Sequence, residues 1–217
     1  MKVDVPIRCS CGALSGVARG VSPKNGSRVV CYCDDCQSFA HFLGRADEIL
    51  DAHAGTDVFS TTLAHLEINE GADQIACVRL KPDGMFRWYA GCCRTPIGNT
   101  FPSPKSPFIS VVHSCMDHAS DIRSRDEVLG PIRSRANGRF AKGDLSTLEA
   151  HPRIPLSMLP LVAKLFVAKL RGEHSPSPFF DDEKGEFCVA PHVLSEAELR
   201  QVRSAGGEHV NSGGYDT

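Results

Sequence analysis

The chain has 217 residues, of which 41% are hydrophobic and 23% charged, with a formal net charge of −2 at pH 7. That length accommodates one large domain, or a domain of about 110 to 150 residues with an extension. The small net charge gives no overall attraction to nucleic acid or an anionic membrane. No stretch approaches the roughly 20 apolar residues of a membrane span, and the N-terminus lacks the apolar core of a signal peptide. We therefore expect a cytoplasmic protein without nucleic-acid or membrane partners.

The first part of the chain predicts a hairpin, a strand and a helix. Residues 3–9 and 13–18 alternate as short strands do and are separated by a glycine. A further strand runs to Cys31. A helix follows at once, and the carboxylate of Asp34 is placed to cap it.

Residues 57–112 predict a succession of short strands separated by turns, over residues 57–62, 65–68, 74–80, 85–89 and 108–112. Because strand follows strand without long helices between them, this part favours antiparallel sheets over a parallel α/β fold. The sequence therefore predicts a mostly β domain over residues 1–113.

Residues 114–205 predict an extension that packs on this domain. The extension contains a basic loop over residues 122–142 and a helix over residues 155–171, in which apolar residues recur near a 3.6-residue period. A short final helix opens at Ser195 with the spacing of a capping box. The tail over residues 206–217 is predicted to be disordered.

Cys31, Cys33 and Cys36 lie at the junction of the predicted strand and helix and indicate a metal site. A C-x-C pair places two sulfurs on the same side of an extended chain, and the following C-x-x-C brings a third back in the first helical turn. The chain has ten cysteines, and in a reducing compartment the clustered spacing of most of them is typical of metal sites rather than disulfides. Cys77, Cys115 and Cys188 are isolated and are expected to be small apolar side chains. Zinc prefers tetrahedral thiolate coordination, so three sulfurs leave a fourth position for a cysteine, water or substrate.

Three cysteine segments together resemble the glutathione-dependent formaldehyde-activating enzyme family, namely Cys9-Ser10-Cys11-Gly12, Cys31-Tyr32-Cys33-Asp34-Asp35-Cys36 and Cys93-Arg94-Thr95-Pro96. The resemblance covers about residues 5–113 and implies an Mss4-like β-tent built around cysteine-ligated zinc. It implies a structural zinc to which Cys9, Cys11 and Cys93 contribute. It also implies a second zinc at a catalytic site that is formed by Cys31, Cys33 and Cys36.

One ligand of the family pattern is missing, because Ala90 stands where the family has a cysteine. Cys92 is the obvious replacement, yet neighbouring cysteines in an extended chain point apart. Either a tight turn lets Cys92 and Cys93 share one metal with the first cysteine pair, or Cys92 closes the second site and makes it structural. Arg94 also replaces the glycine that usually follows these cysteines.

The resemblance implies a zinc-dependent carbon–sulfur lyase that acts on a thiol adduct such as S-hydroxymethyl glutathione. His41, one turn beyond Cys36, is a candidate proton relay for that chemistry. The alternative is a non-catalytic zinc-binding protein-interaction module with a closed four-cysteine site, using the helix over residues 155–171 and the basic loop as its surface. A zinc-ribbon-like nucleic-acid binder is disfavoured by the charge. The sequence leaves the oligomeric state open.

Overall fold

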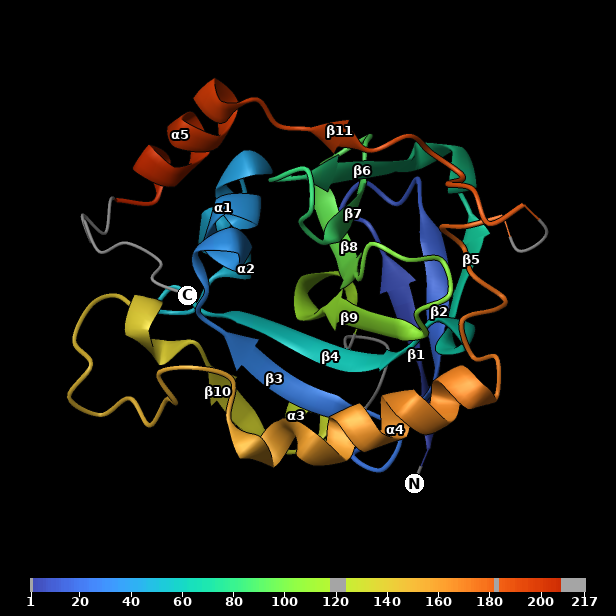
Figure 1. Cartoon of the computed structure of the whole chain (residues 1–217), viewed down its shortest axis with the longest axis horizontal. Coiled ribbons are helices and arrows are strands. Elements are labelled where there is room, and N and C mark those ends of the chain that lie inside the picture. The colour runs from blue at the N-terminus through green and yellow to red at the C-terminus, as the bar shows by residue number, and fades with distance from the viewer. Residues whose placement is uncertain (1, 118–123, 182–183, 208–217) are drawn as a thin grey trace.

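The computed structural model describes residues 2–117, 124–181 and 184–207, and within these residues the chain folds into two β-sheets with helices packed around them (Figure 1). The smaller sheet is antiparallel, with the strand order β1-β2-β5. The larger sheet has eight strands in the order β10-β3-β4-β9-β8-β7-β6-β11. The prediction of a mostly β fold is confirmed.

The smaller sheet consists of β1 (Val3–Arg8), β2 (Ser15–Val21) and β5 (Leu66–Glu70). The larger sheet consists of β3 (Ser27–Cys31), β4 (Thr56–Thr62), β6 (Ile75–Arg79), β7 (Phe86–Ala90), β8 (Thr95–Thr100), β9 (Phe108–Val112), β10 (Ser134–Ala136) and β11 (His192–Val193). The α-helices are α1 (Asp34–Phe42), α2 (Ala46–Ile49), α3 (Arg125–Leu129), α4 (Leu159–Leu170) and α5 (Glu196–Ala205).

The larger sheet is antiparallel except at its two edges. β10 pairs in parallel with β3, and β11 pairs in parallel with β6. Both edge strands come from the chain beyond residue 113, for which the sequence predicts only loops and helices. Strands of three and two residues are too short to show the alternation from which strands are predicted.

The core that joins the two sheets is completed by the C-terminal part of the chain. Trp88 of β7 is fully buried, and its ring stacks on that of Phe179 with centroids 4.4 Å apart. The ring of Phe180 meets Trp88 edge-on at 5.8 Å. The indole Nε1 donates a hydrogen bond to Thr100 Oγ1 at 3.0 Å, so the one polar atom of this side chain is satisfied.

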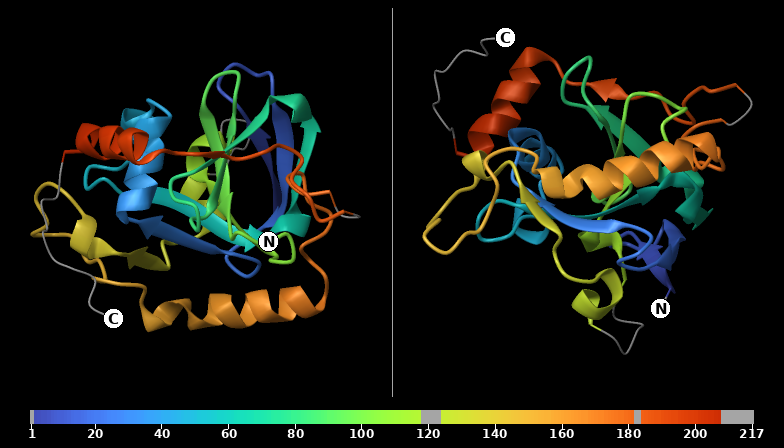
Figure 2. Two further views of the ribbon diagram at one scale, coloured as in Figure 1. Left: turned by 45° about the horizontal axis from the view of Figure 1, so that its top comes forward. Right: turned by 60° about the horizontal axis from the view of Figure 1, so that its bottom comes forward.

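A second cluster lies between α1 and the larger sheet. Phe39, Ala40 and Leu43 are buried against strand residues that include Val29 and Val58. α5 lies alongside α1 and adds partly buried apolar side chains to the same cluster (Figures 1 and 2). The position of α1, and therefore of the cysteine in its first turn, is set by this packing.

The start of α1 corrects one detail of the prediction. The N-cap is Cys33, with φ −62° and ψ 150°, and no side chain caps the helix. Asp34 and Asp35 lie in the first turn, where their carboxylates still interact favourably with the positive end of the helix dipole. Cys33 takes the cap position because the chain must stay extended there to turn its sulfur toward Cys31.

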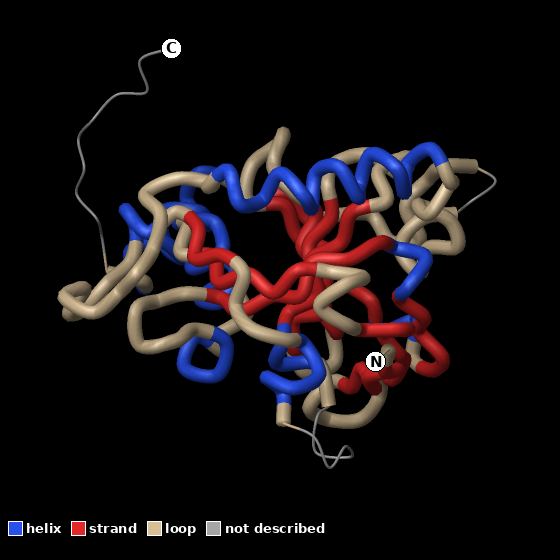
Figure 3. The backbone as a smooth tube through the Cα atoms, turned by 90° about the horizontal axis from the view of Figure 1, so that it is seen from below, coloured by secondary structure: helices blue, strands red, loops and turns tan. Residues whose placement is uncertain are grey.

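The helices of the extension follow the prediction in outline. α5 begins with a capping box formed by Ser195 and Glu198. α4 lies across the outside of the molecule, as the view from below shows (Figure 3). No helix of the described residues is both long and apolar enough to cross a membrane. Residues 208–217, most of the tail predicted to be disordered, lie outside the described part of the chain.

We expect Phe179→Ala to lower the free energy of unfolding by about 3–5 kcal/mol, because it removes a fully buried ring from the face of Trp88. Trp88 is the single tryptophan of the chain, so its fluorescence spectrum during urea unfolding reports on this packing directly. Phe101, whose side chain is exposed, provides the matched control, and Phe101→Ala should cost less than about 1 kcal/mol. Equal losses for the two variants would contradict the packing described here.

Candidate metal centres

Four cysteines from two distant turns form the first group of sulfurs. Cys9 and Cys11 lie in the turn between β1 and β2, and Cys92 and Cys93 lie in the turn between β7 and β8. The Sγ atoms of Cys9 and Cys11 are 3.6 Å apart, and those of Cys11 and Cys92 are 3.4 Å apart. All four Sγ atoms lie within 4.8 Å of one another, so this group can hold one metal ion.

Of the two arrangements that the sequence leaves open for Cys92, the structure has the one with a tight turn. The amide of Arg94 donates a hydrogen bond to the carbonyl of Ala90 at 2.7 Å, which closes the turn. Arg94 takes a left-handed conformation, with φ 59°, that glycine adopts more readily. Its guanidinium lies over the ring of Phe42, 5.0 Å from the centroid, a cation–π contact that helps offset the cost of that conformation.

Hydrogen-bond donors surround the sulfurs of the first group. The amide of Leu14 donates to Cys9 Sγ at 3.2 Å. Burial raises the pKa of Cys93, but hydrogen bonds involving Ser10 and Thr95 outweigh it and lower the pKa to about 5. Cys93 is therefore a thiolate at neutral pH, the form that binds a metal ion.

The second group consists of Cys31 at the end of β3, Cys33 at the N-cap of α1, and Cys36 in the first turn of that helix. The Sγ atoms of Cys31 and Cys33 are 3.4 Å apart, and all three lie within 4.8 Å of one another. The three sulfurs therefore converge, as the C-x-C-x-x-C spacing predicts. Among the described His, Cys, Asp and Glu residues, none supplies a fourth ligand atom to this group.

Two nitrogen donors that the sequence does not predict face the second group. Arg87 Nη1 lies 3.9 Å from Cys36 Sγ, and the buried guanidinium also donates to Asn99 Oδ1 at 3.1 Å. Asn137 Nδ2 donates to Cys31 Sγ at 3.5 Å. An arginine within the otherwise apolar β7 is a signal that sequence reading could have used, because a buried charge requires a partner. Asn137, 106 positions from its partner, offers no such signal.

The negative charge of the second group is concentrated on one sulfur. Hydrogen bonds with Cys31 and then Cys33, together with the charge of Arg87, hold the pKa of Cys36 well below its usual range. The pKa of Cys33 is raised because its sulfur shares hydrogen bonds with those of Cys31 and Cys36. The first thiolate of the group therefore forms beside the guanidinium.

A hydroxyl without a hydrogen-bond partner lies across the sheet ladder from Cys31. Thr56 pairs with Cys31 in the antiparallel register of β3 and β4, so both side chains project from the same face of the sheet. Thr56 Oγ1 is buried and has no hydrogen-bond partner among the described residues. Ser134 Oγ has the same property, but Ser134 pairs with Val29, two positions before the cysteine.

The remaining candidates of the sequence analysis lie outside both groups. His41 is half-buried, and burial and the charge of Lys142 lower its pKa, so the ring is neutral near pH 7. Its Nε2 faces Gly206 at the end of α5, and no hydrogen bond described for it reaches a sulfur of the second group. Cys77 and Cys115 are buried in the core, as expected of small apolar side chains.

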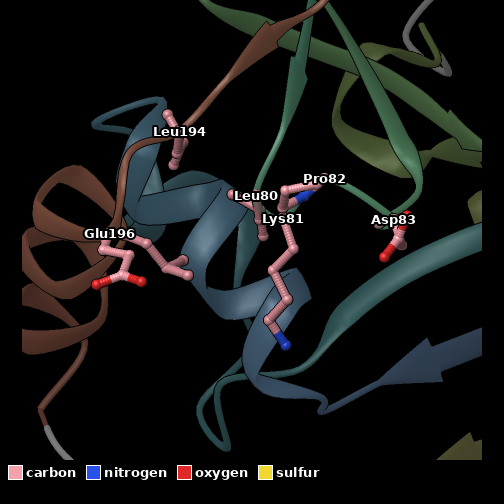
Figure 4. A pocket seen from close by; sticks show the side chains of 8 residues that line it. Leu80, Lys81, Pro82, Asp83, Leu194 and Glu196 are labelled. Carbon is pink, nitrogen blue, oxygen red and sulfur yellow. The ribbon is translucent and has the colours of Figure 1, made fainter.

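An open groove of about 540 Å³ lies between the β6–β7 turn and α5 (Figure 4). Its lining includes Leu80, Leu194 and Leu199, and none of the seven grouped cysteines. Lys81 extends from the turn alongside α1, and its Nζ lies 3.8 Å from the carboxylate of Asp35, the neighbour of Cys36. The groove therefore borders the helix turn that carries the third sulfur.

Comparison with known proteins identifies the family. A family model described as "Family of unknown function (DUF6151)" matches residues 1–190, which include both cysteine groups. The chain belongs to this family. No curated protein matches the chain. A crystal structure of a Rhodobacter sphaeroides protein from structural genomics aligns over 58% of this chain and 96% of its own, with 17% identity and a TM-score of 0.38.

We expect Cys92→Ala to weaken metal binding by the first group alone. The test uses protein in which the second group is disabled by Cys36→Ala, so that only the first group retains metal. Adding Cys92→Ala should weaken the remaining affinity at least about 10-fold, since one of four thiolates is removed. The exposed Cys188 belongs to neither group, and Cys188→Ala should leave the affinity unchanged in the same background. Competition with a metal-sensitive chelating dye measures the difference.

Proposed function

We propose that zinc occupies both sulfur groups, as a closed structural site at Cys9, Cys11, Cys92 and Cys93 and as an open site at Cys31, Cys33 and Cys36. Residues 1–113 contain all seven cysteines and would form the metal-binding unit, with an Mss4-like arrangement of strands around it. Two observations support zinc. The donor atoms are sulfur alone, which zinc accepts in tetrahedral sites. N–H groups also point at the sulfurs, as they do around bound thiolates.

The activity that we propose is that of a carbon–sulfur lyase acting on a thiol adduct such as S-hydroxymethyl glutathione. One observation carries this proposal: among the described residues, the second group has three sulfurs and no fourth protein ligand, while Cys92 belongs to the first group. A site of this kind can accept a substrate sulfur or oxygen. The resemblance of the cysteine segments to the formaldehyde-activating family supplies the substrate class.

The reaction balances without a further reactant. The carbon–sulfur bond of the adduct breaks, its electron pair stays with the sulfur, and the hydroxyl oxygen forms the aldehyde carbonyl as it loses its proton. The proton ends on the released thiol. Bound zinc would supply Lewis-acid stabilisation of the charge on the substrate sulfur or oxygen.

The residues around the second group would act on the charge and orientation of the sulfurs. The guanidinium of Arg87 offsets the excess negative charge of three thiolates, which would otherwise repel an anionic substrate. Asn137 orients the sulfur of Cys31. The hydroxyl of Thr56, which is buried without a hydrogen-bond partner among the described residues, would donate a hydrogen bond to a substrate oxygen that reaches it. We assign no relay role to His41, since its ring packs against Gly206.

The alternative, a non-catalytic zinc module for protein contacts, would require closed coordination at the second group as well. The position of Cys92 argues against that closure. The basic loop that the alternative would use is partly engaged within the molecule, because the amino group of Lys142 bonds to the carbonyl of Gly206 and the guanidinium of Arg139 lies over the ring of Phe140.

We expect Cys36→Ala to lower the zinc content from about two equivalents to about one, and to reduce turnover of S-hydroxymethyl glutathione at least about 100-fold. Zinc is measured by atomic emission on the purified protein, and turnover by the release of formaldehyde. Cys188→Ala, which removes an exposed thiol outside both groups, should change neither value. Unchanged zinc content and turnover in Cys36→Ala would overturn the site. Loss of zinc without any turnover in the wild-type protein would leave the metal site standing and reject the lyase activity.

We expect Thr56→Val to reduce kcat/KM about 10-fold or more while zinc content stays constant, because the substrate loses a hydrogen bond and the metal loses no ligand. The same variant should raise the free energy of unfolding by about 1 kcal/mol, because a buried hydroxyl without a partner is replaced by a methyl group. Ser134→Ala is the matched control: it should also increase stability, with no effect on turnover. Equal kinetics in the two variants would show that Thr56 is an ordinary core residue.

A further inference from the structure

A row of exposed apolar side chains follows α4 and the turn before it. Leu159, Val162, Phe166 and Leu170 are spaced by three or four residues and lie on one face of the helix. Their exposure is high, 63% for Phe166 and 74% for Leu170. Leu156, in the turn that leads into the helix, is 82% exposed and continues the row. We call this set of side chains the outer face of α4.

The opposite face of α4 fixes which way the helix points. Leu161 and Ala168 are buried against the rest of the protein. Lys164, beside them, donates a hydrogen bond to the carbonyl of Lys24 at 2.8 Å. The helix is therefore apolar on both sides, and among the described residues only one side is covered by the rest of the chain. Figures 2 and 3 show α4 lying along the surface with its length exposed.

The size of the outer face is typical of a surface that binds a partner. Together with Ile154 and Val167, it comprises seven large apolar side chains that are 43% to 82% exposed. Contiguous apolar patches larger than a few hundred Å² are rare on monomers and mark interaction sites. In a standard protein interface each partner buries about 800 Å². Seven exposed large apolar side chains are enough to form the apolar centre of such an interface.

The chemistry of the outer face favours a second copy of this chain over an anionic lipid surface. Helices that lie on membranes carry a strongly charged polar face rich in Lys and Arg, whereas Lys164 and Lys169 are the only charged residues of α4. The net charge of −2 gives no attraction to anionic lipid. A two-fold axis across the middle of α4 would place one apolar row against an identical one. The small Ala163, exposed beside that row, allows the helices to approach closely.

We propose that the protein is a homodimer in which the outer faces of two α4 helices pack antiparallel about a two-fold axis. The proposal does not depend on the metal sites or on the lyase activity. It commits the row from Leu156 to Leu170 to a dimer interface, with Phe166 near the axis and Lys169 at the rim. In the dimer the largest exposed apolar set of α4 becomes buried, and solvent and salt screen the charge of the exposed Lys169 at the rim.

The test is sedimentation equilibrium and light scattering on the full-length protein over about 1 to 100 μM, the range in which standard interfaces associate. The wild-type protein should have twice the mass of the 23.5 kDa chain. Phe166→Glu should raise the dimer dissociation constant at least about 100-fold, because two-fold symmetry places a substituted side chain from each protomer in the interface. Circular dichroism and the melting temperature of the dissociated variant check that the monomer keeps its fold, as expected for a change at an exposed position.

Two further variants separate the dimer from other occupants of the face. Leu145→Glu introduces the same charge at an exposed leucine outside α4 and should leave the dimer intact. Lys169→Glu should leave the dimer unchanged or tighten it, since it removes a like charge at the rim. A wild-type protein that is monomeric throughout the range overturns the proposal. So does a monomer that sediments with vesicles containing phosphatidylglycerol and is released by Lys169→Glu, because a lipid surface would then be the occupant.

Discussion

The mutual neutralisation of one buried guanidinium and a cluster of thiols is the interaction on which the centre of this protein depends. Arg87 is buried in the sheet, where an unpaired charge would cost several kcal/mol. Its partners are the sulfur of Cys36, the amide oxygen of Asn99 and the face of Phe39. These contacts tie β7 and β8 to α1, so the helix that carries the third sulfur cannot shift without exposing or orphaning a charge. The thiolate of Cys36 and the guanidinium of Arg87 each lower the free-energy cost of burying the other's charge.

The two sulfur groups differ in how many elements of the fold they connect. The first group joins the β1–β2 turn of the smaller sheet to the β7–β8 turn of the larger one, and a metal ion there would hold the two sheets together. Its four sulfurs would complete a tetrahedral set around a metal ion without any other ligand. The second group lies within one segment, at the junction of β3 and α1. A metal ion there would therefore link only two elements that already follow each other in the chain. If a metal ion binds there as we propose, a fourth ligand from outside the protein would cost the fold little stability.

The extension beyond residue 113 is integrated into the sheet and the core of the protein. It supplies both edge strands of the larger sheet. These short strands pair with backbone groups of β3 and β6 that would otherwise be free to pair with other chains. It also supplies Phe179 to the core and Asn137 to the sulfur of Cys31. α4 departs from this pattern, because it packs on the body with one face and leaves other apolar side chains exposed.

The sequence by itself determined what depends on neighbouring residues: the strand-to-helix junction at Cys31, the convergence of its three sulfurs, the mostly β character and the capping box at Ser195. Backbone periodicity and short-range spacing are sufficient for these. Tertiary structure alone decided the membership of Cys92, because the tight turn closed by the hydrogen bond from Arg94 to Ala90 brings the two adjacent cysteines to the same pair of sulfurs. The register that sets Thr56 opposite Cys31, and the contact of Asn137 with the same cysteine, join positions far apart in the chain. Such contacts leave no local pattern, since they arise only when separate segments pack together.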